Sequence, residues 1–195
     1  MKRSQLLIPV FLLVFLVCGV AFVATSRAGY ETASYEVVKK DGNFEIRKYK
    51  SHVVVSTPMK GNSDNQSFGR LFKYISGGNE AEQKIKMTTP VFMPASGEGQ
   101  PGEMQFVVPA DVAGSGAPSP TDPSVKLSKM SGGEYAVLKY SGRSGPEERR
   151  KKLAELRSIL ASQGLSAVGG PVYAGYDPPW TPGPVRRNEV LLKLP

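Results

Sequence analysis

Hydrophobic residues recur at helical spacing in residues 65–76, NQSFGRLFKYIS. Four of them fall at i, i+3, i+4 and i+7 and share one helical face: Phe68, Leu71, Phe72 and Ile75. The pair Gly77-Gly78 follows, and glycine takes the left-handed conformation that ends a helix without steric cost. The pattern predicts a helix that ends at these glycines. We interpret this helix and the strand that follows it as one wall of a ligand cleft.

Alternation of apolar and polar residues predicts strands on both sides of this helix. Residues 34–61 contain three such runs, and Asp41-Gly42 between the first two is a hairpin signal. In residues 84–93, KIKMTTPVFM, Pro90 removes a backbone donor, so this strand begins late or lies on an edge. A further strand is predicted in EMQFVVP.

The second half of the chain repeats this order. VKLSKM and EYAVLKYSG are predicted strands, residues 146–163 form a helix that opens with Pro146 and ends at Gly164, and GGPVYAGYDPPW and NEVLLKL close the domain. The buried face of the helix consists of Leu153, Leu156, Ile159 and Leu160. The run RRKK at 149–152 is assigned to a solvated face, with contact to anionic lipid as the alternative.

The order strand, helix, strand, strand thus occurs twice. It predicts a pseudo-symmetric α+β fold with mainly antiparallel pairing. Residues 110–124 are rich in Gly, Pro and Ser and are expected to be a loop that joins the two halves.

The N-terminal 28 residues are predicted to be a targeting segment. A basic pair, Lys2-Arg3, precedes the apolar residues 6–24, and small residues around Ala24 and Ala28 suit a cleavage site. At about 1.5 Å per residue, the apolar run also matches the ~30 Å hydrocarbon core. A cleaved signal peptide and a retained membrane anchor both remain open. Export to the periplasm, or attachment to the outer face of the cytoplasmic membrane, is expected; residues 29–34 are a linker and residues 35–195 a single domain.

The composition limits the chemistry of this domain. The chain carries a net charge of +8, partly from its N-terminal segment, and has no concentrated basic stripe, so nucleic acid is not an expected partner. Its one cysteine lies in the targeting segment, and it has one histidine. Cys-His catalysis and a multi-histidine metal site are therefore excluded, and no phosphate-binding glycine motif is present. We do not expect an enzyme.

Several ordered motifs resemble the SOUL haem-binding protein family. They are FEIRKY, YISGGNE, KIKMTTPV, APSPTD and AGYDPPW followed by RRNEVLLKL, which together span about residues 35–195. The resemblance implies a distorted antiparallel β-barrel flanked by two helices, with each half a βαββ unit. It also implies non-covalent binding of b-type haem or another porphyrin, without a reaction common to the family.

The histidine that some family members use for iron is replaced in this chain. Family members proposed to ligate iron through histidine carry it between the Arg and Tyr of the EIRxY motif, where this sequence has Lys48. His52 follows four residues later, a step that would keep it on the same face along one strand. A neutral imidazole is a good haem ligand, so His52 is the candidate metal ligand. The alternative is an edge-strand histidine without metal.

Other members of the family suggest a simpler site, an apolar cleft beside the first helix with basic groups at its rim. Phe68 and Phe72 match the apolar helix positions, and Lys73 matches a basic residue beside them that would bind a propionate. The two phenylalanines also fit an ordinary core stripe. Trp180 is expected to cover the cleft, whereas Thr181 stands where some members carry a lysine.

The sequence thus predicts an extracytoplasmic tetrapyrrole carrier or buffer. Two alternatives remain open. One is a binding module for other apolar or amphipathic small molecules, and the other is an enzyme that modifies tetrapyrroles, for example by removing the metal.

Overall fold

The computed structural model describes residues 29–59, 64–97, 100–178 and 180–195. In the first half the elements are β1 (Glu31–Thr32), β2 (Tyr35–Asp41), β3 (Phe44–Tyr49), β4 (His52–Pro58), α2 (Asp64–Ile75), β5 (Thr88–Thr89), β6 (Val91–Gly97), β7 (Gln100–Pro101) and β8 (Glu103–Val107). In the second half they are α3 (Ala110–Ser115), β9 (Lys126–Met130), β10 (Gly133–Tyr140), α4 (Pro146–Ser162), β11 (Val168–Gly175), a 3₁₀ turn (Gly183–Val185) and β12 (Asn188–Lys193).

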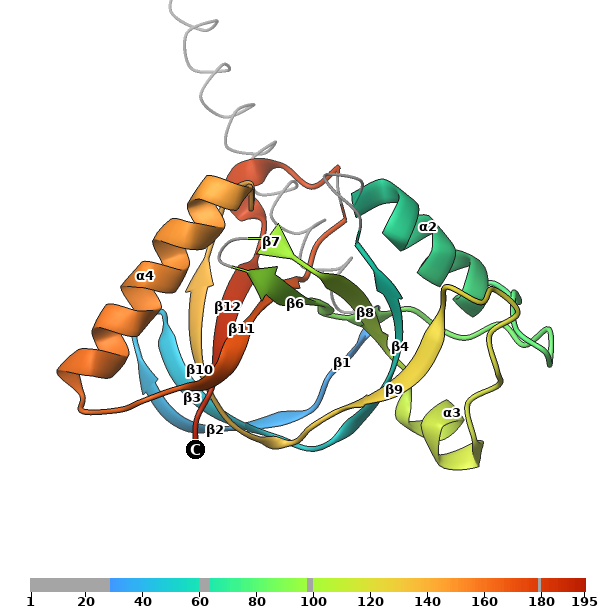
Figure 1. Ribbon diagram of the computed structural model, residues 1–195, viewed down its shortest axis with the longest axis horizontal. Helices are drawn as coiled ribbons and strands as arrows, with labels where there is room; N and C mark the ends of the chain where they lie inside the picture. Colours follow the sequence, from blue (N-terminus) through green and yellow to red (C-terminus); the bar gives the residue numbers. More distant parts are fainter. Residues whose placement is uncertain (1–28, 60–63, 98–99, 179) are drawn as a thin grey trace, which may run out of the picture.

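A ten-stranded antiparallel sheet curls into a half-barrel (Figure 1). Its strands follow the order β2-β3-β10-β12-β11-β6-β8-β4-β9, with β7 paired to β6. The order strand, helix, strand, strand occurs as β4-α2-β6-β8 and again as β10-α4-β11-β12, which confirms the predicted α+β fold. The halves are not independent units, because β10 pairs with β3, β11 with β6 and β9 with β4.

The two faces of the sheet have different partners. One face, the helix face, packs against α2 beside β4 and β8 and against α4 beside β10 and β12 (Figure 1). The other face, the inner face, carries a second cluster supplied by strand residues and by Ala33 and Tyr176. Alternation along each strand divides the residues between the faces, so that Ile46 lies on the helix face and Tyr49 on the inner face.

Helix α2 ends at the predicted glycines. Gly77 has a φ of +112°, its N–H donates to the carbonyl of Tyr74, and the N–H of Gly78 donates to the carbonyl of Lys73 at 2.8 Å. These bonds form a Schellman motif and satisfy carbonyls that the helix leaves open. A Cβ at Gly78 would lie 2.8 Å from the Lys73 oxygen, so the second glycine is required by close packing.

The predicted hairpin is present, but its turn is shifted by one residue. Asp41 pairs with Phe44, so the central residues are Gly42 and Asn43. Gly42 has a φ of +55°, whereas Asn43 is not among the residues with positive φ. Glycine at the first central position is typical of a type II′ turn.

The prediction that residues 149–152 form a solvated face is wrong for Arg149. Its side chain is buried, with its guanidinium 5.5 Å from the Tyr173 ring centroid and its Nε donating to Ser144 Oγ. Arg149 lies four residues before Leu153 and therefore shares the face of α4 that contacts the sheet. Lys152, by contrast, pairs with Glu155 on the exposed side of the helix.

Two segments predicted to lack regular structure contain short elements. Helix α3 lies within residues 110–124, and β1 within residues 29–34 pairs with β5 in parallel. The backbone N–H of Ala33 also donates to the Thr89 carbonyl. These contacts are made by backbone groups, which explains why side-chain periodicity did not indicate them.

A buried ion-pair network crosses the inner face. Arg47 forms a two-pronged pair with Glu189, with Nη1–Oε2 at 2.7 Å and Nη2–Oε1 at 2.9 Å. Arg47 Nε also donates to Glu45, while Arg187 and the Tyr176 hydroxyl donate to Glu189. Burial alone would raise the pKa of Glu45, but hydrogen bonds from Lys139 and Arg47 hold the pKa below its ordinary value.

Tyr49 and Tyr176 make folding sensitive to high pH. Burial raises the pKa of Tyr49 from 10.0 to about 12 and raises the pKa of Tyr176 well above 10.0. The folded state therefore favours the protonated phenols, and the unfolded chain releases these protons first. We expect the free energy of unfolding to fall between about pH 10 and 12, by roughly 2–3 kcal/mol for Tyr49 alone.

Urea unfolding at pH 9 and pH 11.5 measures this loss. Tyr49→Phe should reduce the pH dependence, and Tyr30→Phe, which makes the same change on an exposed ring, is the control. Equal pH dependence in the wild type and in Tyr49→Phe would contradict the assignment to Tyr49.

Candidate functional site

An aromatic pair lies on the outer surface of α2. The rings of Phe68 and Phe72 are stacked, with centroids 6.0 Å apart and planes inclined by 15°. Phe68 also packs edge-on against Phe106 of β8, at 5.2 Å, and is partly buried. Phe72 is 50% exposed. Phe68 thus belongs to the margin of the core, whereas Phe72 presents half of its surface to solvent.

Lys73 follows Phe72 on α2 and is exposed. We call Phe68, Phe72 and Lys73 the α2 aromatic face. An exposed ring beside a cation suits a flat ligand with an anionic edge, because the ring contacts the apolar plane while the ammonium group attracts the anion. Of the five sequence-predicted site residues, these three are the ones that the structure brings together.

Arg70 fixes the start of α2 to the sheet. Its Nε donates to Thr57 Oγ1 at 3.1 Å and its Nη2 donates to the Pro58 carbonyl at 3.0 Å. The Ser67 hydroxyl donates to the same carbonyl. The helix that carries the aromatic face is therefore tied to the end of β4.

The APSPTD motif holds the other end of α2. The Tyr74 hydroxyl donates to the Pro118 carbonyl at 2.9 Å, and Thr121 Oγ1 donates to the Gly78 carbonyl at 3.0 Å. Hydrogen bonds from Ser124 lower the pKa of Asp122, and the charges of Arg70 and Lys73 act in the same direction. Asp122 thus partly balances the positive charge around the α2 aromatic face.

His52 lies away from this face. It is two residues before Val54, whose side chain belongs to the inner cluster, so both point to the inner side of the sheet, opposite α2. Its Nε2 lies 3.3 Å from the Ser34 carbonyl oxygen. A ligand bound on the α2 aromatic face is out of reach of this imidazole.

The expectation that Lys48 and His52 share a face of one strand is wrong. Lys48 belongs to β3 and lies on the same side as Ile46, whereas His52 begins β4. These strands have different neighbours, since β3 pairs with β2 and β10, and β4 pairs with β8 and β9. Residues 50 and 51 separate the two strands. The alternation of side chains along one strand therefore does not relate Lys48 to His52.

Trp180 is 78% exposed, so its ring packs over little of the protein surface. The loop that carries it is nevertheless fixed, because Arg186 Nε donates to the Thr181 carbonyl at 2.7 Å and the Arg187 N–H donates to Asp177 at 2.6 Å. The pair Arg186-Arg187 thus orders this loop. The predicted role of Trp180 as a cover of the cleft stays a prediction.

Three methionines contribute packing. Met93 and Met104 are buried in the cluster on the helix face, and Met87 packs against it. Across the described residues, no group of three or more His, Cys, Asp and Glu side chains is arranged to hold a metal ion.

Two features were missed by sequence reasoning. The inner-face ion pairs were missed because Glu45, Arg47 and Glu189 alternate with apolar residues, a pattern that also describes solvated strand positions. A cavity of about 250 Å³ beside α4 was missed because it depends on the path of the chain after the helix. The sequence placed the ligand cleft beside α2, where the structure shows an exposed aromatic face.

The membrane prediction concerns a part of the chain that lies outside the described residues. Within the described residues, no helix is long and apolar enough to cross a bilayer. The predicted targeting segment, residues 1–28, stays a prediction.

Known structures share the fold of this chain. The C-terminal domain of EcmrR aligns with a TM-score of 0.56 at 11% identity, covering 83% of this chain and 98% of that domain. A hydrolase from Listeria innocua aligns with a TM-score of 0.56 at 12% identity, covering 81% and 94% of the two chains. At these identities the likeness concerns the fold alone.

Sequence comparison identifies relatives over most of the chain. Heme-binding protein 1 of Xenopus tropicalis is 30% identical over 162 residues, which is 78% of this chain and 84% of that protein. Heme-binding protein 2 of Homo sapiens is 31% identical over 157 residues, which is 71% and 72% of the two chains. The sequence model described as SOUL heme-binding protein matches residues 30–193, and the chain therefore belongs to the SOUL haem-binding protein family.

Proposed function

We propose that this protein binds haem or a related tetrapyrrole non-covalently on the α2 aromatic face and acts as a carrier or buffer outside the cytoplasm. Family membership and the relatives named heme-binding proteins support the ligand class. The observation that carries the proposal is the half-exposed ring of Phe72, stacked on Phe68 beside Lys73.

The chemistry of these residues fits a porphyrin. The exposed surface of Phe72 offers an apolar plane for the macrocycle, and Phe68 behind it holds the ring in place. Lys73 supplies a cation for a propionate group. Both ends of α2 are fixed to the rest of the domain, so the face is preorganised for binding.

The residues around this face favour binding without a strong iron ligand. The single histidine of the chain lies on the opposite side of the sheet. Lysine is protonated in water and has no lone pair for iron unless burial lowers its pKa, and Lys73 is exposed. Binding through ring contact and charge leaves the ligand exchangeable, which suits a carrier or buffer.

Two other functions remain to be distinguished. A module for other apolar or amphipathic molecules would bind unrelated planar dyes as well as porphyrins. An enzyme that modifies tetrapyrroles would release an altered product, for example iron-free porphyrin, when it is incubated with haem. Dye titration and product analysis separate these alternatives from haem binding alone.

Haemin titration of the full chain in mild detergent, followed by Soret absorption, tests the proposed site. Lys73→Glu should weaken binding about fivefold, because a propionate loses its cation and meets a carboxylate. Lys151→Glu, which makes the same change on α4, is the matched control. Iron-free protoporphyrin should bind within about threefold of haemin, and His52→Ala should leave the Soret band unchanged. A large spectral change in His52→Ala with no effect of Lys73→Glu would show that the ligand lies elsewhere.

The half-exposed position of Phe72 predicts that Phe72→Ala affects the ligand more than the fold. We expect haem affinity to fall about 3–10-fold through loss of the ring contact. The cost in stability should be about 1 kcal/mol, because half of the ring is already in water. Leu71→Ala, at the buried neighbouring position, should cost about 3–5 kcal/mol with unchanged affinity in the folded fraction. Unchanged haem affinity in Phe72→Ala would remove this residue from the site.

Export is proposed from the apolar run after Lys2-Arg3. In fractionated cells the domain should lie beyond the cytoplasmic membrane, either free or attached to it. Mass spectrometry of the N-terminus distinguishes a cleaved segment from a retained one. A cytosolic protein that begins at Met1 would contradict the export proposal.

A further inference from the structure

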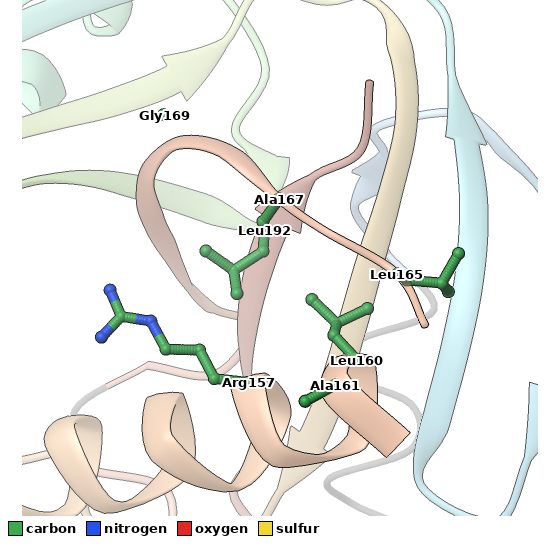
Figure 2. A pocket seen from close by; sticks show the side chains of 7 residues that line it. All are labelled: Arg157, Leu160, Ala161, Leu165, Ala167, Gly169 and Leu192. Atoms are coloured by element: carbon green, nitrogen blue, oxygen red, sulfur yellow. The ribbon is translucent and has the colours of Figure 1, made fainter. Parts of the chain in front are cut away.

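A cavity of about 250 Å³ opens between the C-terminal half of α4 and the strands behind it. Figure 2 shows its apolar wall, which comes from Leu160 and Ala161 of α4, Leu165 and Ala167 of the following turn, and Leu192 of β12. Leu160 and Leu192 are buried, and Leu165 is partly exposed at the opening. The cavity therefore combines a fixed apolar floor with access to solvent.

A shift in strand register accompanies the cavity. Val168 of β11 pairs with Lys193, but Val172 pairs with Leu191, so four positions of β11 correspond to two of β12. The extra residues include Gly169, which has a φ of +75° and lines the cavity. A Cβ at Gly169 would have no other atom within 4 Å. The bulge therefore lies at the cavity, which Gly169 and Leu192 both line.

The chain after the helix differs between the two halves. At the end of α4 the N–H of Leu165 donates to the Leu160 carbonyl, as the N–H of Gly78 donates to the Lys73 carbonyl at the end of α2. After α2 the chain then returns through Ile85, whose N–H donates to the Ile75 carbonyl and whose side chain is 6% exposed in the core. The return after α4 is shorter, none of residues 163–170 is buried, and Leu165 is 36% exposed beside the cavity.

Arg157 is the one charged residue among the seven that line this cavity. Its guanidinium lies to one side of the cavity in Figure 2, with Leu165 on the other side. A guanidinium has five N–H donors, so it can bind a carboxylate while it keeps other contacts. An apolar wall with a cation at its edge selects molecules that have an apolar tail and an anionic head.

We infer that this cavity binds an amphipathic monocarboxylate, with its short apolar tail between Leu160 and Leu192 and its carboxylate at Arg157. Its volume lies just below the 300–1,000 Å³ typical of pockets for drug-sized ligands, which favours a short acyl chain over a complete porphyrin. The site lies on α4 and shares no residue with the α2 aromatic face. It goes beyond the proposed haem function and does not depend on it.

Titration of the full chain in mild detergent with octanoate tests the inference, with methyl NMR shifts and calorimetry as readouts. The methyl signals of Leu160, Leu165 and Leu192 should move on binding. Ala161→Phe should abolish binding, because the new ring fills the cavity from an exposed helix position. Arg157→Gln should weaken binding about 5–10-fold, and Arg157→Lys should restore part of the loss.

Matched ligands and variants complete the experiment. Octan-1-ol carries the same tail without charge and should bind at least fivefold more weakly than octanoate, and acetate should not bind. Arg150→Gln, on the same helix outside the cavity, should bind octanoate as the wild type does. Thermal unfolding of each variant checks that the fold is intact.

Three results would overturn the inference. They are the absence of octanoate binding to the wild type, equal binding by a folded Ala161→Phe variant, and octan-1-ol binding that equals octanoate binding and is unaffected by Arg157→Gln. Competition with haemin distinguishes the two sites. Displacement of octanoate by haemin in the wild type, together with loss of haemin binding in Ala161→Phe, would assign the cavity to the tetrapyrrole and contradict a separate carboxylate site.

Discussion

The ion pair between Arg47 and Glu189 is the constraint on which the rest of this structure depends. It joins β3 to β12, which flank β10 on its two sides, across 142 residues of sequence. Both side chains are fully buried, and an unpaired buried charge costs several kcal/mol, so each residue requires the other in place. The pair bridges β10 on the inner face and so fixes the relative position of three neighbouring strands.

The motifs that identify the family supply the residues of this network. Glu45, Arg47 and Tyr49 belong to FEIRKY, Tyr176 belongs to AGYDPPW, and Arg187 and Glu189 belong to RRNEV. In the structure these residues bind one another on the inner face, away from both helices. The most specific sequence motifs thus contain residues that stabilise the sheet. The site that we propose for the tetrapyrrole lies outside this network, on α2.

The two helices occupy similar places in the two halves but present different surfaces. Helix α2 shows a half-exposed aromatic ring beside a lysine, and the chain after it returns with Ile85 packed into the core. Helix α4 buries Arg149 against the sheet, and the short return after it leaves a cavity. A repeated backbone plan with unequal connections therefore provides two chemically different surfaces on one domain.

The sequence by itself determined the main helices and strands and their order, because helical and strand periodicity and glycine at helix ends are local properties. It placed Phe68, Phe72 and Lys73 together, since a single helix fixes their relative positions. Only the tertiary structure decided that His52 faces away from them and that Arg149 is buried. Periodicity tells which residues share a face, but what covers that face depends on strands that are distant in sequence. The cavity likewise arises from the register of β11 with β12, which no local pattern encodes.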